Sequence, residues 1–170
     1  MALTHPKSFT PEQLTKRIHS WRLRNEKIVF TNGCFDILHP GHCAYLAEAK
    51  ALGTKLVIGL NTDASVKAQN KGKERPINNQ EVRSFMLAAL HSVDAICLFD
   101  SNTPLELIVS LKPDILVKGA DYDPNISDSS HKQYIVGSTE VKNYGGSVEV
   151  IEFLEGYSTT SFIEKIKNIG

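Results

Sequence analysis

The sequence predicts an α/β fold: a Rossmann-like, doubly wound sheet of five parallel strands with helices on both faces. Short runs of β-branched and aromatic residues alternate with longer amphipathic stretches along the chain, as in repeated βαβ units. The run from Leu56 to Leu60 contains no polar side chain, which indicates a strand buried on both faces of a parallel sheet. Ligands bind at the carboxyl ends of such strands, so the residues that follow each strand are the first candidates for function.

The length of the chain suits one domain of this kind. Its 170 residues are enough for a full sheet with its helices. We expect residues 1–9 to be flexible and residues 10–170 to form a single domain. The 19 basic residues balance the 19 acidic ones, so the net charge gives no support to a nucleic-acid partner.

The cysteines and the apolar content indicate a cytoplasmic protein. Cys34, Cys43 and Cys97 form no Cys-x-x-Cys pair and fall inside expected elements as reduced thiols do, so we expect no disulfide. No segment approaches about 18 consecutive apolar residues, and no apolar segment follows a basic leader at the N-terminus. We therefore expect neither secretion nor an association with a membrane.

The first half of the chain is expected to contain three helices and two strands. Thr10, Pro11 and Gln13 predict a capping box with a proline at the first helical position. Gly53 is placed to end the second helix. The expected ranges are a helix at 10–24, a strand at 28–30, a helix at 43–52, a strand at 56–60 and a short helix that begins at 61–63.

The second half is expected to alternate in the same way. Asn79 is a candidate N-cap, and Thr103 with Glu106 predicts a second capping box. Residues 121–132 are rich in turn formers, so we expect a mobile loop there. The expected ranges are a helix at 79–91, a strand at 95–99, a helix at 103–111, a strand at 115–117, a helix at 138–144, a strand at 147–151 and a final helix at 159–169.

Two histidines follow the first strand in a pattern that indicates anion binding. After a turn that ends at Gly33, the sequence His39-Pro40-Gly41-His42 opens the second helix. Histidines three apart at a helix start lie on one side of the chain and can both donate to an anion such as a phosphate. Gly33 lets the backbone approach that anion without a Cβ in the way. The stretch is neither a Walker loop nor a Gly-x-Gly-x-x-Gly loop.

Two other interpretations of the histidines remain open at this point. A zinc site would need a third or fourth ligand close in sequence, and only Asp36 is available. The pair could also be a helix cap with no function. Their position directly after a strand and a Gly-Cys-Phe-Asp turn favours a functional site.

Four polar clusters follow expected strand ends and are candidates for one common site. The carboxyl ends of parallel strands share one edge of a sheet, so side chains that follow them can converge on one ligand. The clusters are residues 31–42, 61–63, 118–122 and 156–160.

The residues that follow the first strand resemble the His-x-Gly-His signature of the nucleotidyltransferase superfamily. The resemblance begins at Thr31–Asp36 and continues through His39–His42. Further stretches are similar, in order, to the D-glycero-β-D-manno-heptose 1-phosphate adenylyltransferases, so that the resemblance covers residues 10–170 as a nucleotidyltransferase domain. These stretches are 61–67, 75–76, 118–122, 135–137 and 156–160.

This resemblance implies transfer of AMP from ATP to D-glycero-β-D-manno-heptose 1-phosphate, giving ADP-heptose and pyrophosphate for lipopolysaccharide or surface-glycan precursors. The attacking phosphate oxygen is already ionised, so no general base is required. His39 and His42 would act as electrostatic donors, with Mg²⁺ bridging phosphate oxygens. The resemblance also implies a homodimer. The alternatives are a glycerol-3-phosphate-type cytidylyltransferase and a non-catalytic nucleotide-binding module.

The residues expected in this site fall into three groups by role. His39, His42, Lys71 and Arg75 are expected to be catalytic. Asp36 and Arg83 are expected to contact the acceptor phosphate, and Asp36 is also the expected metal ligand. The residues expected to bind the nucleotide are Thr31, Asn32, Gly33, Cys34, Phe35, His39, His42, Asn61, Asp63, Lys118, Gly119, Asp121, Tyr157, Ser158, Thr159 and Thr160. For Cys34 we expect only the backbone to matter, because a thiolate would repel phosphate.

Two loops have open roles. The loop at 69–76 carries Lys71, Lys73 and Arg75, and it is either an ordinary surface loop or a lid that closes over the pyrophosphate. Which of the two lysines would contact phosphate is left open. Residues 127–133 resemble an insertion relative to the heptose enzymes, so their contacts with the acceptor are also left open.

Overall fold

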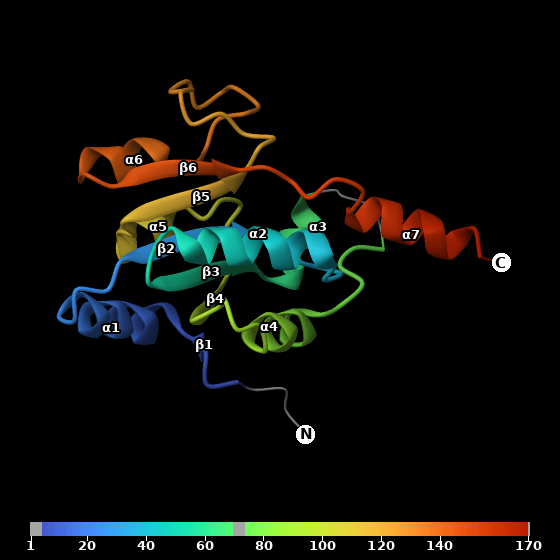
Figure 1. Cartoon of the computed structure of the whole chain (residues 1–170), viewed down its shortest axis with the longest axis horizontal. Coiled ribbons are helices and arrows are strands. Elements are labelled where there is room, and N and C mark those ends of the chain that lie inside the picture. The colour runs from blue at the N-terminus through green and yellow to red at the C-terminus, as the bar shows by residue number, and fades with distance from the viewer. Residues whose placement is uncertain (1–4, 70–73, 170) are drawn as a thin grey trace.

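The computed structural model describes residues 5–69 and 74–169 and confirms an α/β fold built on a parallel sheet (Figure 1). The strands of the described residues are β1 (Ser8–Phe9), β2 (Ile28–Gly33), β3 (Lys55–Asn61), β4 (Ala95–Phe99), β5 (Ile115–Gly119) and β6 (Ser147–Ile151). The helices are α1 (Pro11–Arg22), α2 (Pro40–Ala51), α3 (Asp63–Ala68), α4 (Gln80–Ala88), α5 (Leu105–Leu111), α6 (Ser138–Asn143) and α7 (Thr159–Lys167).

The prediction of five strands is wrong, because the sheet in the described part of the chain has six, in the order β1-β4-β3-β2-β5-β6. All neighbouring pairs are parallel. The additional strand is β1, which pairs with β4 at Ser8 and Phe9. It lies in the segment 1–9 that was expected to be flexible. Phe9 packs against the core, and two residues are too few to produce a sequence pattern.

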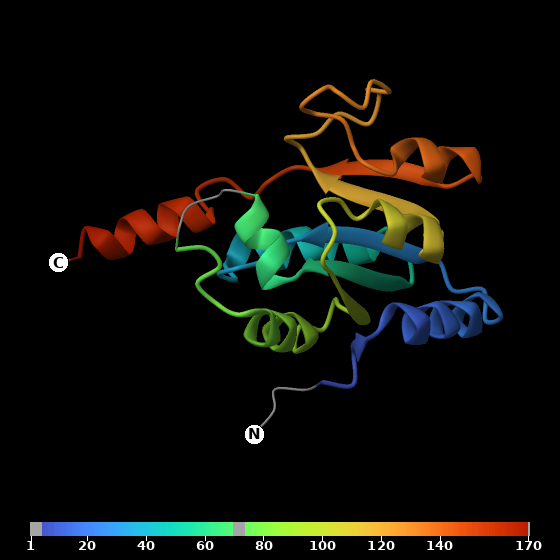
Figure 2. The same cartoon turned by 180° about the vertical axis from the view of Figure 1, so that it is seen from behind.

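Two layers of helices cover the sheet (Figures 1 and 2). Leu46 of α2 and Leu87 of α4 belong to the core on one face. Leu14 of α1, Ile108 of α5 and Val141 of α6 belong to the core on the other. The helix α7 buries none of its residues and extends away from the sheet. No helix within 5–69 and 74–169 is long and apolar enough to span a membrane.

The sequence predicted one of two capping boxes correctly. The box at α1 is confirmed, because the Thr10 backbone N–H donates to Gln13 Oε1 at 2.9 Å and the Gln13 N–H donates to Thr10 Oγ1 at 3.3 Å. The box predicted at Thr103 is wrong. Pro104 is the N-cap of α5, and a proline side chain has no acceptor for the helix.

The order of the strands fixes where a ligand can bind. The chain passes from β2 to β3 on one side, and later places β5 on the other side of β2. Such a switch point leaves a crevice at the carboxyl ends of the two flanking strands. Here those ends are Gly33 of β2 and Gly119 of β5.

Candidate active site

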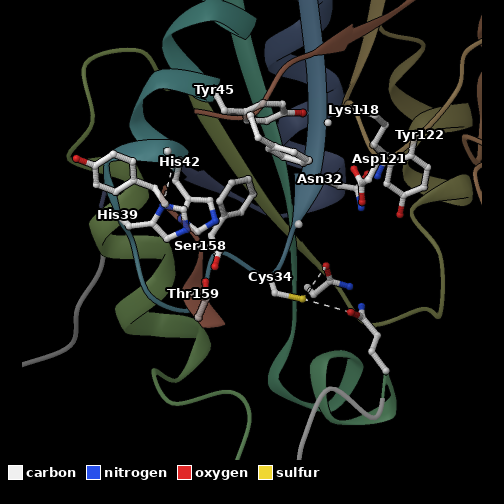
Figure 3. A pocket seen from close by; sticks show the side chains of 18 of the residues that line it. Asn32, Cys34, His39, His42, Tyr45, Lys118, Asp121, Tyr122, Ser158 and Thr159 are labelled. Atoms are coloured by element: carbon white, nitrogen blue, oxygen red, sulfur yellow. Dashed lines mark hydrogen bonds between the residues drawn. The ribbon is translucent and has the colours of Figure 1, made fainter. Parts of the chain in front are cut away.

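A cleft of about 1000 Å³ lies at the carboxyl edge of the sheet (Figure 3). Residues that follow β2, β3, β4, β5 and β6 line it, together with the first turns of α2 and α7. The predicted residues that the structure brings together in this lining are Asn32, Gly33, Cys34, Phe35, His39, His42, Asn61, Lys118, Gly119, Asp121, Tyr157, Ser158 and Thr159.

His39 is the N-cap of α2, and this position sets its tautomer. Its Nδ1 accepts a hydrogen bond from the His42 backbone N–H at 3.3 Å. In a neutral imidazole the other nitrogen then carries the proton, so Nε2 is a donor. A Cβ on Gly41 would lie 3.1 Å from two atoms of the His39 ring and 3.2 Å from Tyr157 Cβ. Glycine at this position therefore lets the ring and the α7 segment approach the helix start.

His42 stacks on His39, with ring centroids 3.8 Å apart. Burial is the main cause that lowers the pKa of His42 to about 4, and the adjacent His39 lowers it further. Burial also lowers the pKa of His39. Both rings are thus neutral at pH 7 in the free protein. His42 Nδ1 is buried, and the two stacked rings stand together at the start of α2.

The start of α7 lies beside the imidazoles (Figure 3). Ser158 caps this helix by accepting from the Ser161 N–H at 3.0 Å. The Phe162 ring lies nearly parallel to the His39 ring at 6.3 Å between centroids. The first turn of a helix presents N–H groups without intrahelical acceptors and a positive dipole end. Two helix N-termini, of α2 and α7, therefore meet at this end of the cleft.

Lys118 and Asp121 lie on the other side of the end of β2 (Figure 3). Lys118 Nζ is 2.5 Å from Asn32 Oδ1 and 5.2 Å from the centroid of the Tyr122 ring. Lys118 is only 9% exposed. An ammonium group thus sits within the cleft at the switch point between β2 and β5.

Cys34 contacts the cleft with its side chain as well as its backbone. Its Sγ lies 3.4 Å from Gln69 Oε1 and 3.9 Å from Asn61 Oδ1. The Asn61 amide nitrogen donates to Ser65 Oγ at 2.8 Å. These neutral groups form a polar wall at the end of β3.

Arg83 does not line the cleft, and its predicted contact with the acceptor phosphate does not fit its position. It is 1% exposed. Its Nε donates to the Asn78 carbonyl at 3.0 Å, its Nη1 to the Cys34 carbonyl at 2.7 Å, and its Nη2 to Asp63 Oδ1 at 2.7 Å. Asp63, the partner in this ion pair, lies outside the cleft lining, and its nucleotide contact stays a prediction. Arg83 therefore holds three segments together behind the cleft.

The side chain of Asp36 is also fully buried. Its carboxylate accepts from the backbone N–H groups of Ile77 and Asn78 at 2.9–3.0 Å. Arg75 Nε lies 2.6 Å from Asp36 Oδ2, a close ion pair whose angle is not that of a hydrogen bond. Both oxygens of this buried carboxylate have protein partners. Asp36 therefore fits neither of its predicted roles, which were to bind a metal ion and to contact the acceptor phosphate. The described residues contain no cluster of three His, Cys, Asp or Glu side chains that could hold a metal ion.

The remaining predicted residues lie elsewhere. Thr31 is buried within β2 and outside the cleft lining, and its hydroxyl is 2.7 Å from the Tyr45 hydroxyl. Thr160 is exposed and outside the cleft lining, and Arg75 belongs to the ion pair with Asp36. Lys71 and Lys73 lie outside the described residues.

Several residues that line the cleft were given no role by the sequence patterns. They include Asn102, Thr103 and Pro104, which follow the end of β4. The rule that strand ends converge applied to this strand as well and would have found them. The other lining residues without a predicted role are Gly41, Tyr45, Gln69, Phe99, Tyr122, Val136, Phe153, Leu154, Glu155, Gly156 and Ser161.

Comparison with known sequences places the chain among nucleotide-transferring proteins. The model of the cytidylyltransferase-like family matches residues 30–165. The chain is 51% identical over 156 residues to the bifunctional protein HldE of Marinomonas sp. (strain MWYL1), and 49% identical over 164 residues to the bifunctional protein HldE of Helicobacter pylori (strain G27). These matches cover 92% and 96% of this chain but 31% and 32% of the relatives. The chain thus spans about a third of their length.

Two solved structures are similar in fold. A lipopolysaccharide core biosynthesis protein from Thermoplasma volcanium GSS1 has a TM-score of 0.56 and 29% identity, covering 78% of this chain and 99% of that one. The pantoate-beta-alanine ligase of Francisella tularensis has a TM-score of 0.59 and 16% identity, covering 94% and 76%. The second match, at its low identity, shows the fold alone.

The lowered pKa of His42 predicts a dependence of stability on pH. The folded chain keeps His42 neutral down to about pH 4, whereas the unfolded chain takes up the proton near the ordinary pKa of 6.5. Between these values the unfolded state binds more protons, so the free energy of unfolding falls as the pH falls from about 6.5 to about 4. Urea unfolding across this range measures the slope.

Two variants serve as the comparison. His42→Asn lacks the titrating ring, so its unfolding free energy is expected to fall less steeply over the same range. His19→Asn removes an exposed histidine of α1 and is expected to keep the wild-type slope. Equal slopes for wild type and His42→Asn would contradict the lowered pKa.

Proposed function

The chain belongs to the cytidylyltransferase-like family, and on that premise we propose that it transfers AMP from ATP to D-glycero-β-D-manno-heptose 1-phosphate, giving ADP-heptose and pyrophosphate. The observation that carries the proposal is the stacked pair His39 and His42 at the start of α2, beside the start of α7 in one cleft. The similarity to HldE proteins over nearly the whole chain supports the heptose acceptor. The product would serve lipopolysaccharide or surface-glycan synthesis.

The imidazoles and the two helix starts are proposed to bind the nucleotide phosphates. His39 Nε2 and a ring nitrogen of His42 would donate to phosphate oxygens, and the Gly33-Cys34 backbone would lie against the triphosphate. Bound phosphate would raise the pKa of both rings, since an anion favours the charged form. Gly119, Asp121 and Tyr157 would line the adenosine side.

The reaction needs no protein base. An ionised phosphate oxygen of the acceptor attacks the α-phosphorus, the bond from that phosphorus to the bridging oxygen of the β-phosphate breaks, and pyrophosphate leaves. Negative charge develops on the phosphate oxygens in the in-line transition state. Fixed N–H donors aimed at that charge lower the barrier because they are already oriented.

Mg²⁺ is proposed to enter with ATP. This ion keeps several waters and commonly binds through substrate phosphates, which agrees with the sealed Asp36 and with the lack of an acidic cluster among the described residues. When bound, it would neutralise charge on the transferring phosphates.

The homodimer and the cytoplasmic location expected from the sequence stay predictions.

A substrate panel tests the proposed reaction. Purified protein would receive ATP or CTP with either heptose 1-phosphate or glycerol 3-phosphate, and pyrophosphate release would be measured. ATP with heptose 1-phosphate is expected to turn over fastest, since polar groups left unpaired by the wrong base discriminate strongly. Faster turnover of CTP with glycerol 3-phosphate would replace the assignment by the cytidylyltransferase alternative. No release with any pair would favour a binding module.

Replacement of either imidazole tests the role of the pair. His39→Asn and His42→Asn are each expected to lower kcat about a hundredfold, the scale of roughly 3 kcal/mol for one transition-state donor. Asparagine is itself a good N-cap, so His39→Asn keeps the start of α2. His19→Asn is the matched control and is expected to keep wild-type turnover. Near-normal kcat in His39→Asn or His42→Asn would refute the catalytic role of that ring.

A further inference from the structure

The segment between β6 and α7 presents apolar side chains to the cleft. Phe153 is 58% exposed, Leu154 45% and Tyr157 43%, and all three line the cleft. Large apolar side chains that are exposed together in a concave site commonly mark a surface for a ligand. The phosphates and the sugar hydroxyls of the two substrates are polar and make no use of such a surface. The nucleobase is the part of the substrates that matches it.

The ring of Phe153 is held in place by close contact with a glycine. Ile151 at the end of β6 pairs with Gly119 at the end of β5, and Phe153 follows two residues later. A Cβ on Gly119 would lie 2.1 Å from Cζ and 2.6 Å from Cε1 of the Phe153 ring. The ring thus occupies the space in which any other residue at position 119 would carry its side chain. More than half of Phe153 nevertheless stays exposed to a ligand.

We propose that Phe153 stacks on the nucleobase of the bound nucleotide and thereby favours a purine over a pyrimidine. The proposal rests on the proposed function and names a residue that selects the donor nucleotide in the same cleft. An aromatic side chain can stack on the π-face of any base. The two fused rings of adenine cover more of the phenyl ring than the single ring of cytosine does, so ATP gains more from the contact than CTP.

A polar group beside the ring also suits a nucleoside. The same Cβ on Gly119 would lie 3.0 Å from Asp121 Oδ1, so the carboxylate and the Phe153 ring approach one point at the end of β5. A carboxylate accepts hydrogen bonds from hydroxyl and amino groups. A nucleoside carries such donors next to a flat apolar base. A phosphate would be repelled by Asp121, and a sugar has no flat ring to stack.

The same segment leads from the ring to the imidazoles. A Cβ on Gly41 would lie 3.2 Å from Tyr157 Cβ, and the next residue, Ser158, caps α7 beside His39 (Figure 3). Figure 3 shows Asp121 across the end of β2 from the imidazoles. A nucleotide that lies along residues 153–158 would therefore have its base at Phe153 and its phosphates at the imidazoles and the start of α7.

The test compares Phe153→Ala and Phe153→Tyr with Phe85→Ala. Phe85 is an exposed aromatic residue of α4 outside the cleft lining, so its replacement removes a phenyl ring elsewhere. Tyrosine keeps a ring that can stack on a base. The Kd values of ATP, CTP and tripolyphosphate are measured by calorimetry in the presence of Mg²⁺ and without an acceptor. Tripolyphosphate has the three phosphates of the nucleotides but no base.

Phe153→Ala is expected to raise the Kd of ATP about 10- to 100-fold, the scale of one stacked base, and the Kd of CTP by a smaller factor. The Kd of tripolyphosphate is expected to change less than about twofold. Phe153→Tyr and Phe85→Ala are expected to match the wild type. An unchanged Kd for ATP, an equal loss for tripolyphosphate, or an equal loss in Phe153→Tyr would overturn the proposal.

A double-mutant cycle tests whether Gly119 seats the ring. Gly119→Ala is expected to weaken ATP binding in the wild-type background, because the new Cβ displaces the Phe153 ring. The same substitution in Phe153→Ala is expected to change the Kd of ATP less than about twofold, since the colliding ring is gone. Residues in contact show such non-additive effects. Equal effects of Gly119→Ala in both backgrounds would contradict the seating of the ring.

These titrations need no turnover, so failure of the proposed function would be recognised separately. If the substrate panel releases no pyrophosphate, weaker binding of ATP by Phe153→Ala would still support the stacking contact. Wild-type protein that binds ATP no more tightly than tripolyphosphate would reject it, even if the reaction were confirmed. Light scattering and urea unfolding accompany the titrations. A changed oligomeric state with an unchanged Kd for ATP, or a failure of both Phe153 variants to fold, would overturn the proposal.

Discussion

The buried guanidinium of Arg83 is the interaction on which the geometry of the cleft depends. Its planar fork reaches the turn after β2, the start of α3 and the segment before α4 at once. A lysine could not do this, because an ammonium group lacks the fixed set of donors that a guanidinium presents in one plane. Its charge is matched by Asp63, so burial leaves no unpaired ion.

Asp36 makes a second link between the turn after β2 and the segment before α4. It holds the backbone at Ile77 and Asn78 while Arg83 holds the carbonyl of Cys34, so the turn after β2 is tied twice to the segment that precedes α4. That turn leads directly into His39. The catalytic donors proposed here are thus fixed by buried charges that touch no substrate, and the N–H groups are oriented before a nucleotide arrives.

The sequence predicted the fold well because its strands are strongly apolar and its helices have clear starts. It missed β1, which is two residues long and is held by pairing with β4 rather than by a pattern of its own. It placed His39, His42 and Ser158 in one cleft, because strand ends converge in a parallel sheet. It also placed Asp36 and Arg83 there, since sequence spacing does not reveal which polar side chains are buried by backbone partners. The loop residues Lys71 and Lys73 lie outside the described residues, so their predicted role as a lid stays a prediction.

The central claim is that one cleft at the carboxyl edge holds ATP and a sugar 1-phosphate on opposite sides of the reacting phosphorus. A crystal structure of the chain with Mg²⁺, the methylene-bridged ATP analogue and heptose 1-phosphate would test it most directly. The nucleotide phosphates are expected against His39, His42 and the first turn of α7, with the acceptor phosphate on the far side of the α-phosphorus. Nucleotide phosphates bound away from the two imidazoles, with both substrates at saturating concentration, would contradict it.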